Sequence, residues 1–161
     1  MFYLLSKWIS EKAVTMKGLS VMIIVSACLA GVECRYNGSS ATIPKVVDLV
    51  IKGEAIPICP EVLAGLPTPR PPVEQVSGKI VSEAGEDQTE DYIAGAKIGL
   101  EIALLSHCKK AILKSNSPTC GCGRIYDGTF SGKLVQGEGV FSKLLKESGI
   151  EVSTEEIFIS A

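Results

Sequence analysis

The most constraining feature of the sequence is a continuous run of apolar, largely β-branched residues from Ser20 to Ala27. A strand that is buried on both faces has this pattern, which is typical of parallel sheets. Two further short strands are predicted, over Ala55–Ile58 and around Ala111–Leu113. Segments with helical spacing lie between them, so the chain is predicted to form a parallel sheet flanked by helices.

Helix signals support this alternation. Thr42 and Thr89 are candidate N-caps, and Gly149 is a candidate stop signal. A last strand is predicted over Val152–Ile159. The sequence therefore predicts an α/β chain with a Rossmann-like three-layer fold and a mostly parallel sheet. The predicted helices cover residues 43–52, 89–106 and 140–147.

The connections between these elements contain many turn residues. Residues 66–72 carry four prolines, which excludes a helix or a central strand and predicts a stiff loop. Polar residues 82–88 form another connection. The glycine-rich segment after Cys120 is expected to hold a hairpin.

Composition limits the classes of partner. With 161 residues the chain fits one domain, and its net charge of −2 without a basic cluster argues against nucleic-acid binding. No apolar stretch is long enough for a transmembrane helix, so no membrane partner is expected. We expect residues 1–21 to be a helical or disordered extension and residues 22–161 to be the domain. The extension is a poor signal peptide, so a cytoplasmic protein with reduced thiols is expected.

Three of the six cysteines follow predicted strands: Cys28 the first, Cys59 the second and Cys120 the third. Loops that follow parallel strands share one edge of the sheet, where ligands bind. These three cysteines, distant in sequence, should therefore meet. Cys108 precedes the third strand and is expected to be a small buried hydrophobe at the opposite edge.

The identity of a metal centre stays open at this point. Zinc would need a fourth ligand, and the only histidine, His107, is expected at the wrong edge. An all-cysteine set also suits an iron–sulfur cluster. Cys34 and Cys122 lie in loops at the active edge, and each is either a further ligand or a spare thiol.

Four ordered blocks then make the sequence recognisable. They are Ser26–Gly31 with Cys34–Gly38; Cys59–Glu61 with Gly65–Pro67 and Pro69–Arg70; Lys114–Gly121; and Tyr126–Ser131 with Gly137–Val140. In this order they resemble the TudS-type thiouracil desulfidase family, and the similarity extends from about Met22 to the C-terminus.

The resemblance implies an enzyme that removes sulfur from a thiolated pyrimidine or a related small thioamide, releasing hydrosulfide. It implies a 4Fe–4S cluster held by Cys28, Cys59 and Cys120, which leaves one iron open. It further implies Ser117 as a catalytic residue. The active-site acid is assigned to Glu61, with Glu54 as the alternative.

Two other functional classes remain open from sequence. One is an accessory or sulfur-carrier protein that binds a cluster or metal without catalysis, and it would tolerate loss of Ser117. The other is a thiol-redox protein that uses Cys120 and Cys122. Three cations in the matching loops, Arg35, Arg70 and Lys114, are either substrate contacts or solvated charges.

Overall fold

A computed structural model describes residues 21–160, so all but one residue of the predicted N-terminal extension lies outside the described part. Its centre is a four-stranded sheet in the order β2-β1-β5-β8, and all three strand pairings are parallel. The bounds of these strands are Ile23–Ser26 (β1), Ala55–Ile58 (β2), Lys110–Leu113 (β5) and Glu151–Thr154 (β8). Among residues 21–160, no helix has both the length and the apolar character to cross a bilayer.

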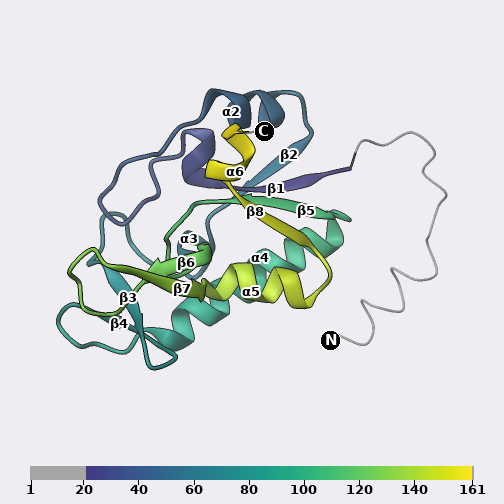
Figure 1. Ribbon diagram of the computed structural model, residues 1–161. Coiled ribbons are helices and arrows are strands. Elements are labelled where there is room, and N and C mark those ends of the chain that lie inside the picture. Colours follow the sequence, from purple (N-terminus) through teal and green to yellow (C-terminus); the bar gives the residue numbers. More distant parts are fainter. Residues whose placement is uncertain (1–20, 161) are drawn as a thin grey trace.

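Helices cover both faces of this sheet (Figure 1). On one face, α4 (Thr89–Leu105) and α5 (Val140–Glu147) pack on a core that includes Ile24, Leu113 and Phe141. On the other face, α2 (Pro44–Ile51), α6 (Glu155–Ser160) and the 3₁₀ turn η1 (Ala27–Ala30) surround a second core. The predicted three-layer α/β architecture is confirmed.

The pairing register aligns the carboxyl ends of β1, β2 and β5 at one edge of the sheet. Ile23 of β1 lies opposite Ala55 of β2 and Lys110 of β5, so the three strands start and finish at matching heights. Because all of them run in one direction, the segments that follow them gather at the carboxyl edge of the sheet. That edge is where the predicted cysteines should meet.

Two antiparallel hairpins extend the fold beyond this edge (Figure 1). The hairpin of β6 (Cys122–Tyr126) and β7 (Leu134–Glu138) was predicted from its turn residues. The hairpin of β3 (Val73–Val76) and β4 (Lys79–Ser82) was not. Its turn is the pair Ser77-Gly78, both with positive φ, as a type I′ hairpin turn requires. Two strands of four residues beside a proline-rich loop give too weak a periodic signal.

Several local predictions were wrong. Neither Thr42 nor Thr89 caps a helix: the N-cap positions are Ile43 and Gln88, and neither makes a side-chain cap bond. The Thr89 hydroxyl instead accepts a hydrogen bond from the Ile80 N–H and donates one to Asp87, which joins the helix start to β4.

The C-terminal segment and the segment after β2 also differ from expectation. The last strand, β8, stops at Thr154, and the chain then turns into α6, which begins with two glutamates in its first turn. Directly after Cys59, a short helix α3 (Pro60–Leu63) begins with proline at its first position, a place that proline suits. This short helix fixes the direction of the Glu61 side chain relative to Cys59.

Candidate functional site

The three predicted cysteines line one cavity at the carboxyl edge of the sheet, with a volume of about 390 Å³. Cys28 lies in η1 directly after β1, and Cys59 is the residue that precedes α3. Cys120 ends the loop that follows β5. A fourth thiol, Cys34, is buried in the wall of the same cavity. The topology therefore brings these cysteines together, as their positions after successive strands predicted.

The thiols influence one another strongly. Hydrogen bonding to Cys28 raises the pKa of Cys34 to about 11, and burial contributes further. Hydrogen bonding to Cys34, together with burial, raises the pKa of Cys59 well above its usual range. Burial is the main cause that raises the pKa of Cys120. Without a bound cation these thiols keep their protons, because a thiolate here would be poorly solvated and close to other sulfur atoms.

The donor set is all-thiol and fits a polynuclear iron–sulfur group. All six cysteines are free thiols, and four of them line this cavity. Within residues 21–160, no three His, Cys, Asp or Glu side chains converge closely enough to hold one metal ion. A single ion needs every donor about 2 to 2.3 Å away, whereas the thiolate ligands of a cluster bind different irons and lie farther apart. An all-thiol set that comes from several segments is compatible with a cluster.

The other candidate ligands lie elsewhere. Cys108 precedes β5 and is buried in the apolar core, as expected. Cys122 does not line the cavity; its thiol faces the Val152 carbonyl, 3.7 Å away. His107 also lies outside the cavity lining, in the turn between α4 and β5.

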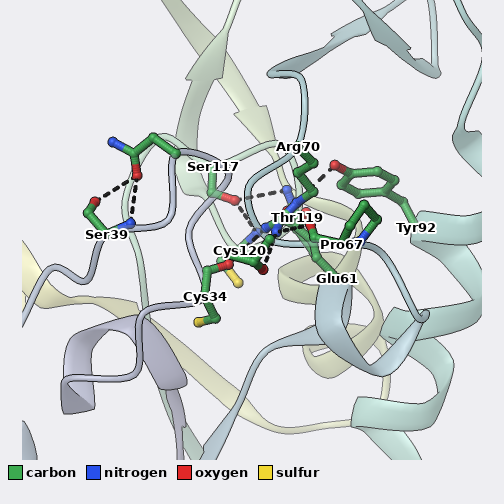
Figure 2. A network of polar contacts seen from close by, with 11 residues as sticks. Cys34, Ser39, Glu61, Pro67, Arg70, Tyr92, Ser117, Thr119 and Cys120 are labelled. Carbon is green, nitrogen blue, oxygen red and sulfur yellow. Dashed lines mark hydrogen bonds and ion pairs between the residues drawn. The ribbon is translucent and has the colours of Figure 1, made fainter.

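Glu61 is the centre of a polar network that joins four segments of the chain (Figure 2). Its Oε2 accepts hydrogen bonds from Arg70, including one from Nε at 2.8 Å, and its Oε1 accepts one from the Thr119 hydroxyl at 2.8 Å. The Tyr92 hydroxyl lies 3.5 Å from Oε2. Burial and the nearby Glu61 charge raise the pKa of Tyr92, which therefore stays protonated. Glu61 still lines the cavity, so the network orients it there.

Arg70 is a structural cation and not a solvated loop charge. Its side chain is 5% exposed, and it pairs with Glu61. The remaining guanidinium N–H groups donate to the carbonyls of Cys34 and Pro67 and to the Thr68 hydroxyl. One arginine thus ties the proline-rich loop to the segments that carry Cys34 and Cys59.

The alternative acid, Glu54, does not reach the site. It precedes β2, at the amino edge of the sheet, and its carbonyl bonds to the Ile23 N–H at the start of β1. Since it is absent from the cavity lining, Glu61 is the carboxylate beside Cys59 that the site can use.

Ser117 lies at the turn that leads to Cys120. Its Oγ accepts hydrogen bonds from the backbone N–H groups of Thr119 and Cys120, each at 3.1 Å. With these donors on the oxygen, the hydroxyl proton stays available for a partner in the cavity, which Ser117 also lines. If that proton were transferred, the same two N–H groups would stabilise the negative charge on Oγ.

Close backbone packing fixes the Cys120 loop. At Gly139 a Cβ atom would lie 2.4 Å from the Thr119 carbonyl and 2.7 Å from the Cys120 nitrogen, so only glycine fits. The Gln75 side chain donates to the carbonyls of Pro118 and Glu138, both at 2.9 Å. Both hairpins therefore position the loop that carries Ser117 and Cys120.

Sequence reasoning missed part of the cavity wall. Glu74 on β3 lines the cavity because of a hairpin that was not predicted, and no sequence signal marked it. The aromatic residues Tyr36, Tyr126 and Phe130 also line it, and all three lie within the motif blocks quoted above. Flat apolar surfaces of this kind suit a planar ring.

Comparison with known proteins agrees with this geometry. A family model described as 2-thiouracil desulfurase matches residues 23–157. An uncharacterized protein of Bacillus subtilis (strain 168), YbbK, is 48% identical over 144 residues, which are 83% of this chain and 95% of that protein. A solved structure of the 4Fe–4S-dependent thiouracil desulfidase TudS superposes with a TM-score of 0.84 at 43% identity, covering 88% of this chain and 95% of the other.

Proposed function

The chain belongs to the 2-thiouracil desulfurase family, and from this premise we propose that it is an iron–sulfur-dependent desulfidase that removes sulfur from a thiolated pyrimidine. The observation that carries the proposal is the meeting of Cys28, Cys59 and Cys120 in one cavity with Ser117 and Glu61. We further propose that the enzyme acts in the cytoplasm, where its thiols stay reduced.

In this proposal Cys28, Cys59 and Cys120 hold a 4Fe–4S cluster. When bound, the cluster supplies an open, soft Lewis-acidic iron that can polarise a thiocarbonyl. The high pKa values of Cys59 and Cys120 mean that loading the cluster displaces protons from these thiols. Cys34 lies against two of these ligands, Cys28 and Cys59, and is not needed as a fourth.

The protein residues handle the water and the protons. Glu61 acts as a general base toward an attacking water: Arg70 and Tyr92 occupy its Oε2, whereas its Oε1 accepts only the Thr119 hydroxyl and keeps a lone pair for the water. Ser117 donates its hydroxyl proton to the ring, and its N–H partners stabilise the charge left on Oγ. Attack by water replaces the thiocarbonyl by a carbonyl, and sulfur leaves as hydrosulfide.

The test is anaerobic reconstitution of the full chain followed by incubation with 2-thiouracil and with 4-thiouracil. We expect the visible absorption of a cluster and equimolar release of uracil and hydrosulfide. Serine variants of Cys28, Cys59 and Cys120 should lose the absorption, whereas Ser117→Ala should keep it and lose turnover. Full activity of Ser117→Ala would contradict the catalytic role of Ser117. A loaded cluster without hydrosulfide release would refute the proposed activity.

A further inference from the structure

Glu74 is a buried carboxylate in the cavity wall that the proposed chemistry does not use. It is 7% exposed and lies on β3, in the hairpin that extends beyond the carboxyl edge of the sheet. Burying a carboxylate is costly unless hydrogen bonds compensate for the lost water. The contacts of its two oxygens therefore show what the residue does.

One oxygen anchors the neighbouring hairpin. Oε2 accepts hydrogen bonds from the backbone N–H groups of Gly128, at 2.9 Å, and Phe130, at 3.0 Å. Gly128 has a φ of +88° and lies so close to Gln75 that a Cβ atom would be 2.8 Å from the Gln75 carbonyl oxygen. The position and direction of the carboxylate are thus fixed by main-chain contacts.

The other oxygen has no protein partner. Across residues 21–160, Oε1 of Glu74 accepts no hydrogen bond, and every fully buried side-chain nitrogen or oxygen does have a partner. Oε1 is therefore accessible, and the open space next to Glu74 is the cavity that it lines. A fixed carboxylate with one free acceptor is suited to bind a donor group of a ligand.

The charges next to Glu74 favour a neutral donor over an anion. Arg70 is paired with Glu61, Lys114 is paired with Glu155, and Arg35, the third cation in the lining, donates to the Ser39 hydroxyl. Among the described residues Glu74 has no cationic partner within 4 Å. An uncompensated carboxylate repels phosphate and attracts N–H groups.

From these contacts we infer that Glu74 is a specificity-determining residue whose Oε1 accepts a hydrogen bond from a ring N–H of the pyrimidine. This inference rests on the proposed function for the class of ligand. It predicts that the enzyme takes a base with an unsubstituted N–H at the contacted position and rejects the N-methylated analogue. Aromatic walls would accept the ring of either compound, so the carboxylate supplies the discrimination.

The test measures binding of uracil, the expected product, to the cluster-loaded protein by isothermal titration calorimetry. Glu74→Gln keeps a carbonyl for the two N–H groups of the anchor but turns an amide donor toward the cavity. We expect uracil to bind roughly 10- to 100-fold more weakly to this variant, because a hydrogen bond to a charged acceptor is lost. The matched control Glu101→Gln, on the exposed face of α4, should bind like wild type.

Methylated ligands give a second readout that needs no variant. Wild type should bind one of the two methylated bases, 1-methyluracil or 3-methyluracil, roughly 10- to 100-fold more weakly than uracil, because that methyl group replaces the contacted N–H. Glu74→Gln should not weaken the binding of that base any further. Unchanged uracil binding by Glu74→Gln, equal wild-type binding of all three bases, or no uracil binding by wild type would each overturn the inference. Uracil binding with the expected pattern but without thiouracil turnover would refute only the proposed function.

Discussion

Breaking the buried ion pair of Arg70 and Glu61 is predicted to lower the stability of the fold substantially. The Arg70 side chain is 5% exposed and the Glu61 side chain 15%, so both charges are largely removed from water. Replacement by methionine, Arg70→Met, keeps most of the apolar volume and leaves the Glu61 carboxylate without its cation. The change also removes the donors to the Cys34 and Pro67 carbonyls.

Breaking a buried pair by removing one partner typically costs about 3–5 kcal/mol. With a urea m-value of about 2 kcal/mol/M, the unfolding midpoint of Arg70→Met should fall by roughly 1.5–2.5 M. The assay is anaerobic urea unfolding of cluster-free protein followed by circular dichroism. Because the pair orients Glu61, turnover of the loaded variant should also fall.

Two comparisons make this prediction refutable. The pair of Lys79 and Asp87 is exposed, with side chains 67% and 44% accessible, so Lys79→Met should leave the unfolding midpoint nearly unchanged. The double variant Arg70→Met/Glu61→Leu removes both charges and should recover much of the lost stability. A loss below about 1 kcal/mol for Arg70→Met would mean that water reaches Glu61 and that the pair resembles a surface one.

Two further predictions concern the Cys120 loop and the thiols. Gly139→Ala should lower the free energy of unfolding by about 1–3 kcal/mol and weaken cluster absorption, because a Cβ atom would meet the Thr119 and Cys120 backbone. Gly53→Ala, with open space around it, should cost about 1 kcal/mol for its positive φ alone and leave absorption unchanged. The pKa of Cys34 is raised to about 11 in the folded state, so the unfolded chain releases this proton first and stability falls as pH rises from about 8.5 to 11. Urea unfolding of cluster-free protein across that range should show the fall, and Cys34→Ala should reduce its slope; an unchanged slope would contradict the thiol origin.

The sheet and the meeting of the cysteines were predictable from sequence for one physical reason. A strand that is buried on both faces appears in the sequence as a continuous apolar run. Because the strands of the sheet are parallel, the loops that follow them lie at the same edge and are neighbours. Strand Ala55–Ile58 was predicted to the residue, and the convergence of Cys28, Cys59 and Cys120 followed from strand order and not from local spacing.

The rest of the site depends on contacts that no periodic pattern records. The short β3–β4 hairpin has no alternation long enough to detect, so Glu74 was missed with it. The role of Arg70 follows from a carboxylate nine residues earlier in the chain, which a sequence pattern cannot pair with it. A threonine at the start of a helix is a typical N-cap, but the Thr89 hydroxyl hydrogen-bonds to the Ile80 N–H and the Asp87 carboxylate instead.

The thiols that line the cavity come from the segments after β1, β2 and β5, which span most of the chain in sequence. No two of the three proposed ligands share a segment, so they meet only once β1, β2 and β5 pair in the sheet. A change that breaks the pairing of these strands would therefore separate the ligands as well as weaken the fold.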